Sequence, residues 1–454
     1  MSDRESSQRE GSGDALPSSG RRRFLALSGI SGVSAALAGC TPDISGTVEA
    51  VDETDDGDEH DDMDEEGVQG ADVELEEAVA ELELAVAELD DEKASTIEND
   101  QTYRIPTDYP TLQAAVDDLS TEWIPPGVQV TLHIESGHQP ASGVAVEQGD
   151  FSRFVITADD DPVVLPGSFD GSFVSGDHAM LPVLDCSIDM AGNGEHGYAV
   201  GTCSVGRVER NRAIRNAGSN AVYVLNGRVD VRDCTLTDAQ LCGIRATHTS
   251  SVAARQADVS GAGDYGVRAS YGSTVYLTRG KANDCGAHGI YAIRSRVIGE
   301  ATEFNNNGVN GVRANRGAHV SLTALDGGNS PTVIENSGGH GIWATNASTV
   351  DAQDVVIHNC DHGVRGQEAS TINVRGADIR NCDRAVGAVT GSQVVAVGAR
   401  CSDSSGNSDL VVWGASTIDA TDCQTTSGTP WVGDINLSEF NSLEGRGTIF
   451  DRNA

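Results

Sequence analysis

The sequence contains little positive charge and almost no lysine. Its 30 Lys and Arg residues are outnumbered by 69 Asp and Glu residues, which gives a formal net charge of −39, and Lys93 and Lys281 are the only lysines. A chain this acidic repels phosphate groups, so we expect no nucleic-acid partner. Because salt screens repulsion among carboxylates, the charge indicates a halophilic, haloarchaeal protein. The alternative is a mesophilic protein with one acidic linker, but the acidic excess continues beyond the linker.

The chain also lacks a hydrophobic run of membrane-spanning length. The apolar run over residues 26–38 is short, is interrupted by Gly and Ser, and follows Arg21, Arg22 and Arg23. Paired arginines before such a run resemble a twin-arginine export signal, and Leu-Ala-Gly-Cys at residues 37–40 resembles a lipobox. In such lipoproteins the cysteine, here Cys40, carries two acyl chains and anchors the protein. Residues 1–40 therefore predict export and attachment, through lipid alone, to the outer face of the cell membrane.

Residues 41–100 form a strongly acidic segment. Between residues 46 and 100 there are 24 Asp and Glu residues against Lys93. The first half has almost nothing to bury, so we expect a disordered stalk. In the segment 73–92, apolar residues alternate four and three positions apart: Leu75, Val79, Leu82, Val86 and Leu89. This short seam predicts either a coiled coil that forms a homo-oligomer or a single acidic helix.

A repeat of about 22 residues occupies residues 191–430. Each copy reads Gly, then Val or Ile, then Arg or an aromatic residue, then a small residue, as in Gly266-Val267-Arg268-Ala269. The Val or Ile recurs at steps of 22 or 23 residues, with one step of 30, at positions 222, 244, 267, 290, 312, 342, 364 and 386. Two further short strands complete each copy, without a helix-length segment. This pattern predicts an all-β, single-stranded parallel β-helix, and the long step predicts a looped insertion over residues 326–332.

Residues 101–190 are expected to form the N-terminal cap and the first coils, and residues 431–454 a C-terminal tail. Thr111 can cap a helix over residues 112–119, whose apolar residues share one face and would cover the open end of the core. Asparagines recur just before the repeated motif, where we expect left-handed backbone and amide stacking between coils. They are Asn216, Asn283, Asn305, Asn336, Asn359 and Asn381.

Three segments carry a resemblance to known families. Residues 108–116 (Asp-Tyr-Pro-Thr-Leu-Gln-Ala-Ala-Val), 125–134 (Pro-Pro-Gly-Val-Gln-Val-Thr-Leu-His-Ile) and 152–157 (Ser-Arg-Phe-Val-Ile-Thr) resemble the entry region of phage tail-spike-like proteins. The coils after them resemble the pectate-lyase-like right-handed β-helix superfamily. The resemblance implies right-handed coils over residues 103–430 and binding, often cleavage, of acidic polysaccharide. No catalytic motif of that superfamily matches, so no catalytic position is carried over.

Nine cysteines remain besides Cys40, so they cannot all pair within the chain. Cys360 and Cys382 are one coil apart, and so are Cys401 and Cys423, which places each pair within reach of a disulfide. Export would allow oxidation. The alternative is a stack of free, buried thiols.

The residue after each repeated Val or Ile is expected to point outward. These residues are Tyr223, Arg245, Arg268, Tyr291, Arg313, Trp343 and Arg365, which we call the arginine stripe. Arginine offers a planar fork to carboxylate or sulfate, and aromatic faces accept sugar rings. The stripe therefore predicts a substrate-binding surface for acidic polysaccharide. The alternative is a solvated ladder whose arginines pair with neighbouring acids.

Histidines and carboxylates gather just before the repeated glycine. The weak catalytic candidates are His340, His362, Asp361 and Asp264, which could act as acid or base, and the alternative is a His–Asp pair in a sharp turn. No closely spaced set predicts a zinc or EF-hand site, and we expect no cofactor, although acidic turns could hold Ca²⁺. Three functions remain open: a glycan-binding or adhesive surface module, a polysaccharide lyase or glycoside hydrolase, and a structural spike.

Overall fold

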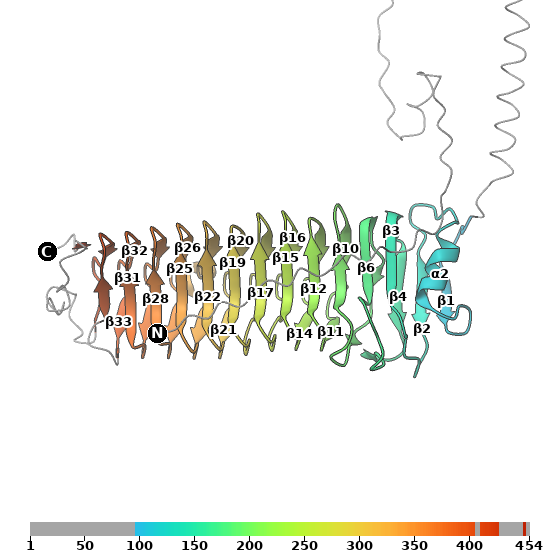
Figure 1. Ribbon diagram of the computed structural model, residues 1–454, viewed down its shortest axis with the longest axis horizontal. Helices are drawn as coiled ribbons and strands as arrows, with labels where there is room; N and C mark the ends of the chain where they lie inside the picture. Colours follow the sequence, from blue (N-terminus) through green and yellow to red (C-terminus); the bar gives the residue numbers. More distant parts are fainter. Residues whose placement is uncertain (1–95, 405–408, 426–447, 451–454) are drawn as a thin grey trace, which may run out of the picture. The chain divides into compact units, whose positions relative to one another are not determined.

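The computed structural model describes residues 96–404, 409–425 and 448–450. These residues form a right-handed parallel β-helix of about 12 turns with about 23 residues in each (Figure 1). The predicted all-β fold and a coil length close to 22 residues are confirmed. The predicted export signal at Arg21 and Arg22, the lipidated Cys40 and the helix over 73–92 lie outside the described residues.

Each regular coil contributes strands to three sides of the solenoid. The first side is formed by the repeated motif and holds β9 (His196–Val200), β12 (Asn220–Leu225), β15 (Cys242–Thr247), β17 (Tyr265–Ser270), β19 (His288–Ile293), β22 (Asn310–Asn315), β25 (His340–Thr345), β28 (His362–Gly366), β31 (Arg384–Ala388) and β34 (Leu410–Val412). The second side holds β10 (Val205–Arg207), β13 (Arg228–Asp230), β16 (Ser251–Ala253), β18 (Thr274–Tyr276), β20 (Arg296–Ile298), β23 (His319–Ser321), β26 (Thr349–Asp351), β29 (Thr371–Asn373), β32 (Gln393–Val395) and β35 (Thr417–Asp419). The third side includes β11 (Ala213–Arg215), β14 (Thr235–Thr237), β21 (Glu303–Asn305), β24 (Val333–Glu335), β27 (Val356–His358), β30 (Asp378–Arg380) and β33 (Arg400–Ser402).

The repeated motif forms the first side because its small residues fit a narrow core. The Val or Ile of one coil is in register with that of the next, as in the pairs Val267↔Ile290 and Ile290↔Val312, and these side chains are fully buried. The preceding glycine also faces the core. A Cβ at Gly341 would lie 2.5 Å from Ile357 Cγ2, which leaves no room for a side chain. Two consecutive inward positions break the simple alternation of a strand and shift the next residue outward.

The N-terminal end of the coils is closed as predicted. Helix α2 (Leu112–Leu119) begins at Thr111, whose hydroxyl accepts a hydrogen bond from Ala114 N at 3.1 Å, and its apolar residues join the hydrophobic core. In Figure 1 it lies at the end of the stack beside β1 (Gln101–Ile105) and β2 (Val130–Ile134), which pair with each other. Further strands near this end are β3 (Val144–Asp150), β4 (Phe154–Ala158), β5 (Val163–Val164), β6 (Val174–Met180), β7 (Val183–Leu184) and β8 (Ile188–Asp189).

The insertion and the C-terminal segment each add a short element. The predicted loop contains a 3-10 turn, η1 (Asp326–Gly328), closed by a bridge between Leu325 and Ser330. In the segment expected to be a tail, β36 (Thr448–Phe450) pairs in parallel with β35. No helix among the described residues has the length and apolarity needed to cross a membrane.

The asparagine prediction is correct for part of the ladder. Asn216, Asn336, Asn359 and Asn381 have positive φ, and Asn359 Nδ2 donates to Asn336 Oδ1 at 3.1 Å. For Asn283 and Asn305 the predicted left-handed position is wrong by one residue, because the left-handed residues of their coils are Asp284 and Asn306. Asn306 and not Asn305 continues the stack, since its amide donates to Asp284 and accepts from Asn336.

The nine cysteines of the described region are free thiols, and eight of them are buried. The sulfur atoms of Cys401 and Cys423 lie 3.6 Å apart, in contact but not bonded. Of the two alternatives for the stacked cysteines, the structure has the buried thiols. Burial raises the pKa of Cys186 and Cys285 to about 12, so these thiols stay protonated.

Candidate functional site: an arginine stripe with a histidine cluster

The arginine stripe is a continuous ladder on the first side of the solenoid. Strand register pairs its members in succession: Tyr223↔Arg245, Arg245↔Arg268, Arg268↔Tyr291, Tyr291↔Arg313, Arg313↔Trp343 and Trp343↔Arg365. Each member is half-buried, whereas the residues on either side of it in the strand are buried. The prediction that these residues point away from the core is confirmed by this pattern.

Two further ladders flank the stripe on the same strands. The histidine ladder precedes it by three residues and consists of His196, Asn220, Cys242, Tyr265, His288, Asn310, His340 and His362. The flanking ladder follows it by two residues and consists of Leu225, Thr247, Ser270, Ile293, Asn315 and Thr345. None of these positions, nor any in the stripe, is Asp or Glu. In a chain with 69 acidic residues, these three ladders combine four arginines with no carboxylate at any ladder position.

Aromatic rings hold the stripe arginines in place. The guanidinium carbon of Arg313 lies 4.4 Å from the ring centroid of Trp343 and 5.2 Å from that of Tyr291, so two neighbouring coils sandwich it. Arg245 packs on Tyr223 at 5.7 Å, and Arg268 packs on Tyr265 at 5.6 Å. Such stacking restricts an arginine side chain and leaves its charge uncompensated.

The stripe arginines are not paired with acids. Within the part of the chain that the structure describes, Arg245, Arg268, Arg313 and Arg365 have no carboxylate oxygen within 4.0 Å. Arginines elsewhere do form such pairs, for example Arg212 with Asp185 at 2.9 Å. The Nε atoms of Arg313 and Arg365 are also buried without a hydrogen-bond acceptor in the described structure. The alternative of an ion-paired, solvated ladder is therefore not what the structure contains.

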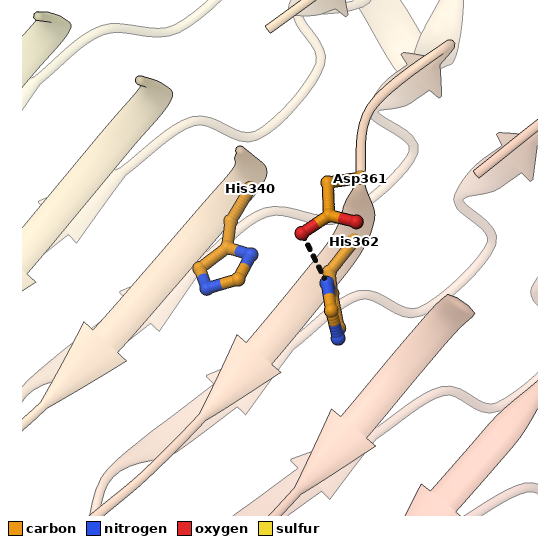
Figure 2. A group of neighbouring side chains, drawn as sticks. All are labelled: His340, Asp361 and His362. Carbon is orange, nitrogen blue, oxygen red and sulfur yellow. Dashed lines mark hydrogen bonds and ion pairs between the residues drawn. The ribbon is translucent and has the colours of Figure 1, made fainter. Parts of the chain in front are cut away.

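Three of the four catalytic candidates meet at the C-terminal part of the stripe. Figure 2 shows His340 on β25 beside Asp361 and His362, which lie at the start of β28 in the next coil. His362 Nδ1 and Asp361 Oδ2 are 3.1 Å apart, so the pair expected for a sharp turn is present. The rings of His340 and His362 meet edge to face at 4.7 Å, and His340 contacts Trp343 of the stripe at 5.0 Å.

The environment keeps His340 neutral. Only 9% of the residue is exposed, and burial lowers its pKa to about 4, with the nearby His362 and Arg365 acting in the same direction. Its Nδ1 atom is buried and has no hydrogen-bond partner. His288, in the same ladder, is also neutral, and its pKa is lowered to about 4 by burial and by Arg313.

The fourth candidate is separate from this cluster. Asp264 precedes β17, and β19 and β22 lie between that coil and the coil of β25. Sequence reasoning also missed Tyr265, the partner of Arg268, and the asparagines Asn220 and Asn310. They occupy the same offset from the glycine motif as the histidines, so this offset was the available signal.

A hollow of about 470 Å³ lies away from the stripe, at the turns after β2 and β4. Asp159, Asp160 and Asp161 line it, and arginine is absent from its lining. Hydrogen bonds from Gly137 N–H and the Ser136 hydroxyl lower the pKa of Asp160, so these acids serve the turn.

A comparison with protein-family models supports the fold. A model of the family described as "Right handed beta helix region" matches residues 180–326. Among solved structures, the chain is similar to the A-module of a mannuronan C-5 epimerase from Azotobacter vinelandii, with 13% identity, a TM-score of 0.37, and 71% of this chain and 94% of that chain covered. It is also similar to HetL, a pentapeptide repeat protein from the cyanobacterium Nostoc, with 11% identity, a TM-score of 0.17, and 52% and 91% covered. No curated protein sequence matches.

Proposed function

We propose that the chain is a cell-surface module that binds acidic polysaccharide along the arginine stripe. The observation that carries this proposal is the set of four arginines that have no carboxylate partner on a surface whose three ladders contain no acid. Unpaired guanidinium groups bind carboxylate and sulfate through charge-assisted hydrogen bonds. The strongly negative remainder of the chain repels a polyanion elsewhere, which favours binding of the polymer at the stripe.

The spacing of the arginines suits a regular polymer that lies along the solenoid axis. Neighbouring coils are about 4.8 Å apart, so Arg245 and Arg268 are separated by one such step and Arg268 and Arg313 by two. Tyr223, Tyr291 and Trp343 stand between or beside the charges and hold Arg245 and Arg313 in position along the stripe. A chain of uronate or sulfated sugars repeats its charges at similar intervals along its length.

The test is the binding of acidic polysaccharides to the full chain in high salt. We expect Arg268→Ala/Arg313→Ala to bind at least about tenfold more weakly, because each lost charge-assisted hydrogen bond costs about 1.5–3 kcal/mol. The matched control is Arg228→Ala/Arg296→Ala, which removes the same charge from exposed residues on the second side. Equal weakening in both variants, or no binding by the wild type, would contradict the proposal and leave the structural spike.

A lyase on the same surface is the second candidate, and one observation favours it. Neutral His340, with Nδ1 unpartnered, lies near Arg365, which could neutralise a uronate carboxylate while a base removes the adjacent C5 proton. The C4–O bond would then break, a C4=C5 double bond would form, and the leaving glycosidic oxygen would take up a proton. Ultraviolet absorbance by the unsaturated product, followed in the same binding reactions, tests this activity. A hydrolase is less well supported, because the three ladders offer no pair of carboxylates.

A further inference from the structure

We propose that His340, Asp361 and His362 bind a divalent transition-metal ion, with Zn²⁺ the best match, at the C-terminal part of the arginine stripe. The three residues come from two adjacent coils, and Figure 2 shows their side chains gathered on one side of β25 and β28. This site is distinct from the Ca²⁺ sites that the sequence analysis allowed in acidic turns.

The distances fit one ion. The three ligand atoms, one from each residue, all lie within 4.8 Å of one another. Zinc holds nitrogen and oxygen ligands at about 2.0–2.2 Å, so two ligands of one ion are about 3.4 Å apart in a tetrahedron and about 4.2 Å apart at most. Small side-chain rotations would therefore complete the site. The 3.1 Å separation of His362 Nδ1 and Asp361 Oδ2 is already close, and the ion would replace the proton between them.

An unsatisfied atom supports the site independently. His340 is about nine-tenths buried, and its Nδ1 has no hydrogen-bond partner, which is costly for a buried polar group. In Figure 2 one ring nitrogen of His340 is directed toward Asp361. A metal ion at the centre of the cluster would supply the missing partner.

The same ladder provides an internal comparison. One coil after His196 and one coil after His288, the ladder holds an asparagine, and its amide nitrogen meets the histidine Nδ1 at 3.3 and 3.2 Å respectively. After His340, the ladder position holds His362 instead, and Asp361 precedes it. Beside His340, two metal-ligating groups therefore stand where His196 and His288 each have an asparagine amide.

The donor set selects the class of ion. Two imidazoles and one carboxylate suit Zn²⁺ and related divalent transition metals, whereas Ca²⁺ and Mg²⁺ prefer oxygen ligands. Three protein ligands leave a coordination position for an external group. Histidines bind a metal as uncharged imidazoles, so two of them and one carboxylate would leave a dication with a net positive charge near Arg365, which favours an anion there. We assign a polysaccharide carboxylate to that position, a step that rests on the function proposed above.

The experiment uses the full chain without an affinity tag, titrated with Co²⁺ as a spectroscopic probe and with Zn²⁺ in competition. We expect visible d–d absorption for one ion, without the thiolate charge-transfer band that cysteine ligation would produce. His340→Gln and Asp361→Asn should weaken this binding at least about tenfold, since even partners that only orient ligands contribute about 10–100-fold to metal affinity. Because every variant keeps the acidic segment over residues 41–100, weak binding there cancels in the comparison.

The matched control is His288→Gln, which removes a buried histidine of the same ladder that already has an amide partner. It should leave Co²⁺ binding unchanged. Circular dichroism and thermal unfolding verify folding, and Asp361→Asn alters an exposed side chain, so it reports on the site even where His340→Gln unfolds the coil. Absence of the d–d bands in the wild type, or equal affinity in the wild type and Asp361→Asn, would overturn the proposal.

Chelation separates this proposal from the polysaccharide proposal. With EDTA, we expect binding of a polyuronate to weaken while binding through Arg268 and Arg313 persists. Metal binding without any effect on polyuronate affinity would overturn the assigned fourth ligand and leave the metal site. Polyuronate binding that depends on the stripe but is identical with and without Zn²⁺ would also rule out a polysaccharide carboxylate as the fourth ligand. The proposed function would then still stand.

Discussion

Single residues in the histidine ladder illustrate how burial sets protonation. His288 is 4% exposed and is surrounded by Tyr265, Tyr291, Asn310 and the positively charged Arg313. Burial and Arg313 lower its pKa from 6.5 to about 4. The folded chain therefore resists a proton that the unfolded chain accepts below about pH 6.5.

This difference makes stability depend on pH. The contribution of neutral His288 to the free energy of unfolding is complete above pH 6.5. It is lost progressively as the pH falls toward 4, because the unfolded chain gains the proton first. Between pH 7 and pH 5 the loss amounts to about 2 kcal/mol. We expect His288→Gln to reduce the fall in unfolding free energy over this range by that amount, measured by chemical denaturation. An identical pH dependence in wild type and variant would show that the folded chain accepts a proton on His288 as readily as the unfolded chain does, which contradicts the prediction.

At the scale of the strand, the glycine of each motif sets how closely coils can stack. Gly341 faces the core, where an added Cβ would lie 2.5 Å from Ile357 Cγ2 and 2.7 Å from Gly363 O. The second of these atoms is backbone and cannot move aside without separating two coils. Gly387 is different, because it occupies the stripe position of its coil and the nearest atom to an added Cβ is 3.7 Å away.

The two glycines form a matched pair for substitution. Gly341→Ala should lower the unfolding free energy by about 1–3 kcal/mol, the usual cost of overpacking. Gly387→Ala introduces the same atom at an ordinary van der Waals distance from its nearest neighbour and should change stability by no more than about 0.5 kcal/mol. Both are measured by denaturation under one salt condition. A Gly341→Ala variant as stable as Gly387→Ala would mean that the motif glycine is not held against the next coil.

For the whole molecule, the uneven distribution of charge is the property most relevant to function. The chain carries a formal charge of −39, yet the three ladders of the first side contain four arginines and no acid. Under the proposed function, we expect a polyanion to be repelled by the chain in general and attracted at the stripe, with high salt lessening the repulsion.

Attachment to the membrane is predicted to depend on Cys40. Two acyl chains contribute about 0.8 kcal/mol for each buried CH₂, which is sufficient for stable anchoring. We expect Cys40→Ala to move the protein from the membrane fraction to the soluble fraction after cell fractionation. Cys203→Ala, which removes an exposed cysteine from the solenoid, should leave it in the membrane fraction. Retention of Cys40→Ala in the membrane fraction would exclude the lipid anchor.

The fold was accessible from sequence because it depends on a repeat. The recurrence of Gly-Val-Arg-Ala at nearly constant steps specifies which residues stack on one another, so the core positions and the arginine stripe could be predicted. The helix after Thr111 could be predicted separately, from its capping residue and its apolar face. Positions that change with a one-residue shift in register were harder to predict. The left-handed residues are Asp284 and Asn306 and not their neighbours, because the exact corner of a coil is set by contacts with the coils on either side.

The sequence by itself therefore determined the periodic part of this protein: a parallel β-helix with a row of arginines and aromatic residues along one side. Only the tertiary structure decided which charges and rings meet. It left the stripe arginines without carboxylates, placed Arg268 on Tyr265, and brought His340 to Asp361 and His362 while leaving Asp264 elsewhere. The physical reason is that such contacts depend on side-chain rotamers and on the residues of adjacent coils, which a repeat spacing does not specify.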